Sequence, residues 1–338
     1  MITIIEQQSL IKLNTFGLKA IAPYYSILKV EEDCRILKDS APNDFPILIL
    51  GGGSNMLFIN DLKYWVIKNE ITGIELLKED EENVWYKVGA GEVWHEFVLH
   101  TIDKGLSGLE NLSLIPGSVG AAPIQNIGAY GVEAKNCLER VHFWDLEQNC
   151  FRILENKDCD FGYRDSIFKR DLKRKVIITF VEFKLSKAPQ NNISYGNIKE
   201  ELDKMGIEKP NAKSISDAVI AIRSSKLPDP KQIGNAGSFF KNPEIDNTIF
   251  NTIKKNYPNI PGYKITENIT KVPAAWLIEQ CGWKGFREGD YGVHPKQALV
   301  LVNYGNAEGK EIFELAEKII KSVKERFSIV LEKEVQMI

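Results

Sequence analysis

An uncharged stretch runs from Asn111 to Val132. Its structure decides whether the chain is a membrane protein or a soluble protein. Its 22 residues could form a bilayer-spanning helix, which needs about 20 apolar residues. The stretch also contains Pro116, Pro123, Gln125, four glycines and two asparagines. Their backbone and amide groups would lack hydrogen-bond partners in lipid. We therefore expect a long loop in a soluble protein.

Bulk composition agrees with this class. The length of 338 residues predicts two or three domains. The chain is 43% hydrophobic and 26% charged, which is typical of globular proteins. The net charge is −3 and no long basic run is present, so we expect no nucleic-acid partner. The five cysteines form no C-x-x-C pair, and the first residues do not resemble a signal peptide. We therefore expect a cytoplasmic protein without a membrane partner.

Two kinds of catalytic site find no support in the sequence. His95 and His100 are five residues apart on an expected helix, so they do not share a face as a metal-binding pair would. No G-x-S-x-G elbow surrounds Ser54, Ser118 or Ser238. We therefore expect neither a metal site nor serine-triad hydrolysis.

Hydrophobic periodicity predicts a mainly β first half followed by a mixed α+β half. Strands are expected within residues 45–61, 63–69, 83–94, 140–147, 150–155 and 175–185, the last three antiparallel. Helices are expected at about 92–104, 273–281 and 307–326, and a final strand at 328–338. Two further helical faces consist of Ala218, Val219 and Ile222, and of Ile249, Phe250 and Ile253. The polar segment 186–213 is expected to link domains.

Two glycine-rich segments could hold a phosphate group. The first, Gly51-Gly52-Gly53-Ser54-Asn55, follows an apolar run and fits either a tight turn or a phosphate nest. The second is "IPGSVGAAPIQNIGAYG", residues 115–131, where small residues leave the backbone accessible and neutral side chains offer hydrogen bonds. This pattern favours a diphosphate-containing cofactor, with a purely structural loop as the alternative.

The segment "GNAGSFFKNP", residues 234–243, places one hydroxyl against two phenylalanines. One interpretation is a turn made by Gly234, Asn235 and Gly237, after which Phe239 and Phe240 enter the core. The other is that Ser238 is delivered to a dry pocket for chemistry.

Two charged candidates also have two interpretations each. Arg164, in "FGYRDSIFK", either pairs with Asp165 or faces a carboxylate or developing oxyanion. Glu332 and Glu334 would share one face of a strand, either at a solvated edge or in a site that holds an acid.

Together these segments resemble the UDP-N-acetylenolpyruvoylglucosamine reductase family, in order and over nearly the whole chain. The "ISYGNI" segment (193–198) is similar to the tyrosine loop of one branch of that family. The matching segments are "NTFG" (14–17), "LGGGSNMLF" (50–58), "VGAGEVWH" (88–95), "GLENLSLIPGSVGAAPIQNIGAYG" (108–131), "FGYRDSIFK" (161–169), "KLPDP" (226–230), "GNAGSFFKNP" (234–243), "AAWLIEQCGWKG" (274–285), "VHPKQALVLVN" (293–303) and "LEKEV" (331–335).

The resemblance implies an α+β flavoprotein of three domains. A two-part FAD-binding module, of the vanillyl-alcohol-oxidase (PCMH) type, precedes a C-terminal α+β domain that binds substrate. The implied boundaries are residues 1–70 with 327–338 for the first FAD-binding lobe, 71–212 for the second lobe, and 213–326 for the substrate domain.

The implied activity is that of a UDP-N-acetylmuramate dehydrogenase in peptidoglycan precursor synthesis. With non-covalent FAD and NADPH as hydride donor, such an enzyme reduces the enolpyruvyl ether of UDP-N-acetylglucosamine, a small-molecule substrate. By resemblance, Ser238 donates a proton, while Arg164 and Glu334 polarise the substrate carboxylate and stabilise an enolate. Glu334 can do so only when protonated, which a dry site beside another carboxylate favours.

The binding residues also follow from the resemblance. Cofactor contacts are expected from Gly51, Gly52, Gly53, Ser54, Asn55, Gly117, Ser118, Gly120, Ala121, Ala122, Gln125 and Asn126. Substrate contacts are expected from Arg223, Lys226 and Asn242 for the diphosphate and uridine, and from Tyr130, Tyr195, Tyr263 and Gln297.

Two other functions stay open from the sequence. A flavin oxidase that shares the FAD-binding module would lack the set of Ser238, Arg164 and Glu334. A UDP-sugar-binding or regulatory protein would have a dead site, against which the intact hydroxyl, basic and acidic positions argue.

Overall fold

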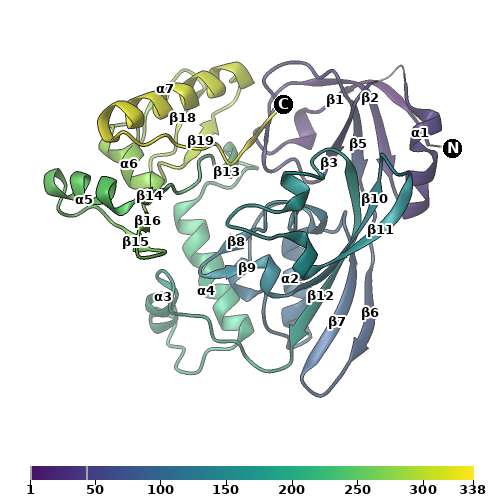
Figure 1. Ribbon diagram of the computed structural model, residues 1–338, viewed down its shortest axis with the longest axis horizontal. Helices are drawn as coiled ribbons and strands as arrows, with labels where there is room; N and C mark the ends of the chain where they lie inside the picture. The colour runs from purple at the N-terminus through teal and green to yellow at the C-terminus, as the bar shows by residue number, and fades with distance from the viewer. Residues whose placement is uncertain (1, 43–44) are drawn as a thin grey trace. The chain divides into compact units, whose positions relative to one another are not determined.

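A computed structural model describes residues 2–42 and 45–338 (Figure 1). The chain divides into two compact units, each made of several segments. Unit 1 comprises residues 1–8, 22–52 and 63–225, and unit 2 comprises residues 9–21, 53–62 and 226–338. The segment 186–213 lies within unit 1, and the division falls after Ser225. The three-domain boundaries given above stay a prediction.

Unit 1 contains a four-stranded sheet with the order β1-β2-β5-β3, in which β5 runs parallel to both neighbours. Its core residues include Leu28, Trp65 and Ile67, which are fully buried. The bounds are β1 (Ile5–Ser9), β2 (Ile21–Leu28), β3 (Ile47–Leu50) and β5 (Trp65–Asn69), with the short helix α1 (Leu37–Ser40) nearby in sequence.

The second sheet of unit 1 has five antiparallel strands in the order β11-β10-β12-β7-β6. Phe97 of helix α2 packs on Phe183 of this sheet with ring centroids 4.9 Å apart, so the predicted helix is confirmed and one of its faces is buried. The bounds are β6 (Ile74–Glu79), β7 (Asn83–Gly89), α2 (Trp94–Asp103), β10 (Leu138–Asp145), β11 (Cys150–Glu155) and β12 (Val176–Ser186).

The uncharged stretch 111–132 is a loop, as predicted, and it ends in the small hairpin of β8 (Gly128–Ala129) and β9 (Val132–Glu133). None of the helices in residues 2–42 and 45–338 combines the length and the hydrophobicity that a membrane span requires. Helices α3 (Ile198–Lys204) and α4 (Ala212–Lys226) follow, and α4 buries the predicted face of Ala218, Val219 and Ile222.

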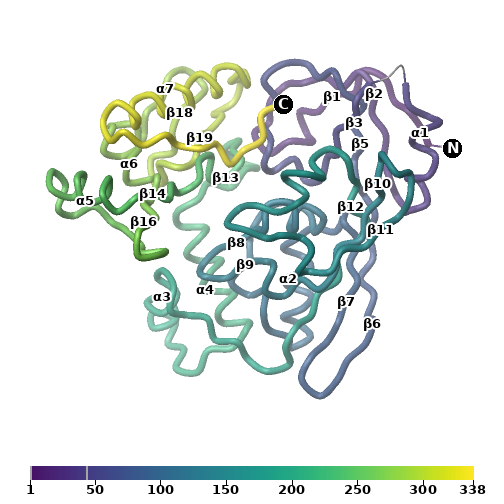
Figure 2. The backbone as a smooth tube through the Cα atoms, viewed as in Figure 1, coloured from purple at the N-terminus to yellow at the C-terminus, as the bar shows by residue number. Residues whose placement is uncertain are grey.

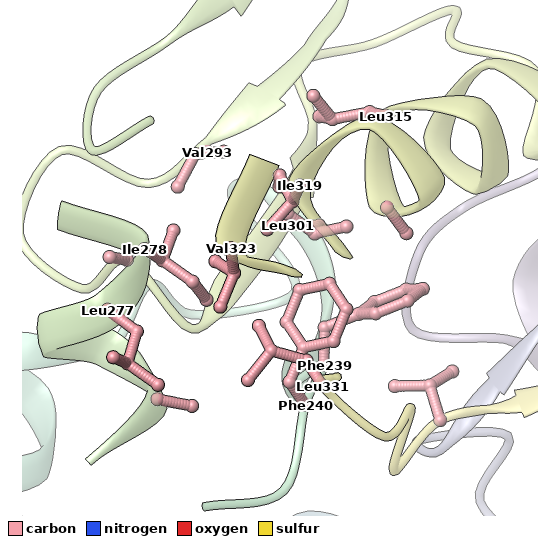
Figure 3. Packing of buried hydrophobic residues seen from close by; sticks show 14 of the residues in the cluster. Phe239, Phe240, Leu277, Ile278, Val293, Leu301, Leu315, Ile319, Val323 and Leu331 are labelled. Carbon is pink, nitrogen blue, oxygen red and sulfur yellow. The ribbon is translucent and has the colours of Figure 1, made fainter. Parts of the chain in front are cut away.

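Unit 2 contains two small antiparallel sheets and the longest helix of the described chain, α7 (Gly309–Phe327). The apolar stripe of α7 lies on a core that includes Phe239, Phe240 and Leu331 (Figure 3). The bounds are β13 (Gly234–Ser238), β14 (Glu244–Asp246), α5 (Asn247–Asn256), β15 (Tyr263–Lys264), β16 (Ile269–Lys271), α6 (Ala274–Gln280), β17 (Arg287–Glu288), β18 (Tyr291–Val293) and β19 (Val300–Asn303).

The C-terminal segment corrects one prediction, because most of residues 328–338 is not a regular strand. After α7 the chain can be followed to the C-terminus in Figure 2. Lys333 forms one isolated bridge with Phe240, and only β20 (Gln336–Met337) pairs as a strand, in parallel with β4 (Met56–Leu57). The C-terminal segment thus pairs first with Phe240 and then with β4, so it forms no single continuous strand pairing.

Two smaller predictions also need correction. Residues Gly234–Ser238 form strand β13 rather than a turn, although Phe239 and Phe240 enter the core as predicted. The side chain of Ile249 is 38% exposed, so only Ile253 of the expected apolar face of α5 is buried.

Candidate active site

The predicted site residues fall in both units. Unit 1 carries Gly51, Gly52, the loop residues 117–126, Tyr130, Arg164, Tyr195 and Arg223. Unit 2 carries Gly53, Ser54, Asn55, Lys226, Ser238, Asn242, Tyr263, Gln297 and Glu334.

In unit 1 the two glycine-rich segments lie against each other. A Cβ atom on Gly51 would be 2.6 Å from the Ser118 hydroxyl, and a Cβ on Gly52 would be 2.9 Å from the Cα of Gly117. Side chains are therefore excluded from this contact, and the two backbones approach closely. Such bare backbone is suited to a phosphate group, because its N–H groups can reach the ligand.

Lys68 also adjoins this glycine pair, although no motif in the sequence marks it. Its ammonium group donates a 2.8 Å hydrogen bond to the carbonyl of Gly51. Burial lowers the pKa of Lys68, while Glu70 raises it. A partly buried cation at this position would favour an anionic ligand.

The rest of the loop is held by packing and by hydrogen bonds to neighbouring segments. Gly120 packs against Ala90, and a Cβ atom added to Gly120 would lie 2.6 Å from the Cβ of Ala90. Ala121 and Ala122 follow it in a short turn. The buried side chain of Asn126 donates to Glu133 and to the carbonyl of Gly162, and accepts from Lys135. The Asn126 side chain therefore holds the loop, and a cofactor contact from Asn126 or Gln125 stays a prediction.

Arg164 lies in a tight turn of unit 1 that Gly162 and Asp165 close through paired backbone hydrogen bonds. Its φ is +54°, a conformation uncommon for a residue with a side chain. Its guanidinium donates to the carbonyl of Gly128. The carboxylate of Asp165 pairs with Arg170 instead, which removes the simple ion pair proposed for Arg164 and Asp165.

Arg223 and Tyr130 meet in the same unit. Burial lowers the pKa of Arg223; hydrogen bonding and charge at Tyr130 raise it, and the positive charge of Arg164 lowers it. Burial raises the pKa of the Tyr130 hydroxyl, against the effect of Arg223. Two arginines that are near enough to influence each other form a site that attracts an anion.

The tyrosine loop lies over this cluster. A Cβ on Gly131 would be 3.1 Å from the Cβ of Tyr195, and a Cβ on Gly196 would be 3.4 Å from the ring of Tyr130. The structure thus brings Tyr130 and Tyr195 to one place, although Tyr195 is 50% exposed.

In unit 2, Ser238 ends a bulged strand. Ser238 is paired with Val300 of β19, and the register shifts between Asn235 and Ser238. Gly237 within the bulge has a φ of +69°, and an added Cβ there would meet nothing within 4 Å. The half-buried Ser238 therefore lies between Gly237, which borders open space, and the buried Phe239. This arrangement agrees with a hydroxyl that lies beside an apolar surface.

Asn235 supports this bulge, and sequence reasoning had assigned it only to a turn. Its buried side-chain amide donates to the carbonyls of Pro228 and Ile233 at 3.2 and 2.8 Å, and its oxygen accepts from the N–H of Gly237 at 3.0 Å. The amide thereby fixes the residue directly before Ser238.

Glu334 reaches the same region through the backbone. Its N–H donates to the carbonyl of Phe239 at 2.8 Å, one residue after Ser238. The neighbouring Glu332 is different, because its exposed carboxylate pairs with Lys241 at 3.0 Å. Glu332 is therefore the solvated member of the pair and is not the second carboxylate of a dry site.

The first glycine-rich segment continues into unit 2. A Cβ on Gly53 would be 2.0 Å from the carbonyl oxygen of Leu13, and the φ of Gly53 is +63°, so this position requires glycine. The amide of Asn55 donates to the carbonyl of Glu334 at 3.3 Å. A predicted cofactor residue and a predicted catalytic residue are thus neighbours in unit 2, with Ser54 between Gly53 and Asn55.

The remaining predicted substrate residues are spread over unit 2. The side-chain oxygen of Asn242 accepts a 2.9 Å hydrogen bond from the N–H of Ala274 at the start of α6, so the side-chain nitrogen of Asn242 is the atom we expect to face a ligand. Gln297 accepts from the N–H of Leu299 at 3.3 Å. Lys226 and Tyr263 are both exposed. Their contacts with substrate stay predictions.

Comparison with known proteins agrees with these features. Residues 27–148 match the model of a FAD binding domain, which covers Gly51–Asn55 and the loop 115–131. Residues 229–338 match the model described as UDP-N-acetylenolpyruvoylglucosamine reductase, C-terminal domain. The backbone contact of the two glycine-rich segments fits an FAD diphosphate. The fold and the matched domains define an α+β flavoprotein, as predicted.

Relatives that match over nearly the whole chain identify the family within this class of flavoproteins. UDP-N-acetylenolpyruvoylglucosamine reductases of Amoebophilus asiaticus and Flavobacterium johnsoniae are 49% and 50% identical to this chain, with 98% of each chain covered. The crystal structure of the Thermus caldophilus reductase matches with a TM-score of 0.69 at 25% identity, over 100% of this chain and 98% of that one. The chain belongs to the UDP-N-acetylenolpyruvoylglucosamine reductase family.

Proposed function

We propose that this chain uses FAD to reduce the enolpyruvyl ether of UDP-N-acetylglucosamine to UDP-N-acetylmuramate, with NADPH as hydride donor. The observation that carries the proposal is 49% identity over 98% of the chain to a reductase named for this substrate. The proposed setting is the cytoplasm, where a monomer would act in peptidoglycan precursor synthesis.

The glycine-rich segments would hold the cofactor. Backbone at Gly51–Asn55 and Gly117–Ala122 would contact its diphosphate, with Lys68 as a nearby cation. FAD, when bound, would supply the hydride chemistry of the reaction. The position of Gly53, where no side chain fits, supports a backbone role for this segment.

The chain's own residues would handle the proton and the charge. Reduction adds one hydride to the methylene carbon of the substrate and one proton to the adjacent carbon, so the carbon–carbon double bond becomes single. Negative charge develops beside the substrate carboxylate before the proton arrives. Arg164 would stabilise this charge, and a protonated Glu334 would donate a hydrogen bond to it. The Ser238 hydroxyl would give the proton.

A spectrum and a product assay test the proposal. The purified protein, reconstituted with FAD, should show flavin absorbance, and acid precipitation should release the chromophore. Incubation with NADPH and UDP-N-acetylenolpyruvoylglucosamine should yield UDP-N-acetylmuramate by mass spectrometry. A protein that binds no flavin, or that makes no product while it binds flavin, would contradict the proposal.

A further inference from the structure

The first turn of helix α2 holds the loop 112–117 through three hydrogen bonds. The backbone N–H of Trp94 donates to the carbonyl of Gly117, and the indole N–H of Trp94 donates to the carbonyl of Leu112, both at 3.0 Å. The next residue, His95, accepts a hydrogen bond at Nδ1 from the backbone N–H of Leu114, also at 3.0 Å. Trp94 thus fixes the two ends of this loop and His95 fixes its middle.

Leu114 is the residue of the loop that needs such support. Its φ is +58°, in the left-handed region that leucine rarely adopts. Its N–H is bonded to His95, and its carbonyl accepts a 3.3 Å hydrogen bond from Nε of Arg223. One peptide segment therefore joins the imidazole of His95 to the guanidinium of Arg223.

Arg223 lies in the anion-attracting cluster of unit 1. Tyr130 and Arg164 both lie near enough to its guanidinium to affect its pKa, which Tyr130 raises and Arg164 lowers. Because Nε is held by Leu114, the direction of the remaining N–H groups depends on the conformation of Leu114. A change at Leu114 would turn the guanidinium away from a ligand.

We propose that His95 is a positioning residue, which fixes Leu114 so that Arg223 faces the diphosphate of a UDP-sugar. This inference rests on the proposed function. His95 acts as an acceptor at Nδ1, so its proton is on Nε2 and the ring is neutral. Burial lowers the pKa of His95, Glu96 raises it and the charge of Arg223 lowers it.

Three substitutions separate the role of Nδ1 from simple packing. His95→Asn keeps an acceptor near the position of Nδ1, His95→Gln places its acceptor one bond further out, and His95→Phe has none. His100→Asn is the matched control, because His100 lies on the same helix but its ring packs edge-on against Tyr86. If His95→Phe fails to fold, His95→Gln supplies the comparison.

The test follows reoxidation of the reduced flavin as the substrate concentration is varied. We expect His95→Gln and His95→Phe to raise the substrate Kd about tenfold, as expected for a lost buried hydrogen-bond partner. The limiting rate should change less than about twofold, since these residues touch no reacting atom. His95→Asn and His100→Asn should resemble the wild type.

A second background decides whether the effect passes through Arg223. In Arg223→Met, the further change His95→Phe should alter Kd less than about twofold, because the residue that is being positioned is gone. An unchanged Kd in both His95→Gln and His95→Phe would overturn the inference. So would a His95→Phe change that raises Kd by the same factor in Arg223→Met as in the wild type. If the substrate does not reoxidise even the wild type, the proposed function fails, and calorimetric titration with UDP decides the inference by the same comparisons.

Discussion

At the scale of single residues, Arg164 shows how the structure removes one of two interpretations that the sequence left open. The adjacent Asp165 forms an ion pair with Arg170, and the guanidinium of Arg164 instead donates a hydrogen bond to the Gly128 carbonyl. The sequence contains both arginines within six positions of Asp165, so local spacing cannot say which one pairs. The turn that decides it depends on paired backbone hydrogen bonds between Gly162 and Asp165.

Removal of the proposed charge-stabilising groups should slow turnover and leave the flavin bound. We expect Arg164→Met or Glu334→Gln to lower kcat on the order of 10²–10³-fold, because a preorganised electrostatic group is lost. Steady-state kinetics and flavin absorbance measure both properties. Arg170→Met is the control and should turn over at close to the wild-type rate. Wild-type kcat in Arg164→Met and Glu334→Gln would remove them from the mechanism.

Two glycines with positive φ should respond differently to alanine. In Gly53→Ala the new methyl group would meet the Leu13 carbonyl at 2.0 Å, whereas in Gly282→Ala it would meet nothing within 4 Å. We expect Gly282→Ala to cost about 1 kcal/mol of unfolding free energy from backbone strain alone, and Gly53→Ala to cost several times more. Urea denaturation measures both values, and equal losses would show that the clash at Gly53 is relieved elsewhere.

At the scale of elements, periodic segments were predictable and irregular ones were not. The strands β10 and β12 and the helix α7 follow their apolar patterns, because their apolar side chains pack into the cores. Strand β13 was missed because Gly234, Asn235 and Gly237 are typical of turns, while its pairing is set by the distant Val300. The contact between His95 and Leu114 was missed for a similar reason, since nothing in either segment marks the partner.

The bulge in β13 yields a prediction at this scale. Asn235→Ala should lower the unfolding free energy by about 1–3 kcal/mol, because it leaves buried backbone groups without a partner. It should also slow reoxidation by substrate, since the residue before Ser238 is no longer fixed. Asn306→Ala removes an exposed amide and should stay within about 0.5 kcal/mol of the wild type. Urea denaturation tests the comparison, and equal stability of both variants would contradict the role given to Asn235.

At the scale of the whole molecule, the order of elements predicted the α+β class, but the division into units depends on contacts that are distant in sequence. Residues 9–21 and 53–62 join unit 2 through positions such as Gly234 and Gly309, where a Cβ would lie 2.1 and 1.8 Å from backbone oxygens of Phe16 and Phe58. Nothing in those short segments identifies their partners. Boundaries drawn along the chain therefore stay a prediction.

Removal of the cofactor should weaken the fold as a whole. FAD that binds only the folded chain would raise the unfolding free energy by about 2.7 kcal/mol at a free concentration of 100 times its Kd. Thermal unfolding of the apoprotein at increasing FAD concentrations measures this, with a Tm that rises with FAD. A Tm that does not respond to FAD would contradict a specific cofactor site.

The most direct test of the proposed reaction follows the two half-reactions separately in the wild type and in Ser238→Ala. Ser238→Ala removes one oxygen, so flavin reduction by NADPH should keep nearly its normal rate. Reoxidation by UDP-N-acetylenolpyruvoylglucosamine should be fast in the wild type and about 10²–10⁴-fold slower in the variant, the usual value of general-acid assistance. Stopped-flow flavin absorbance measures both steps. Reoxidation at the same rate in both proteins would show that Ser238 does not supply the proton, and a wild type that the substrate cannot reoxidise would contradict the proposed reaction itself.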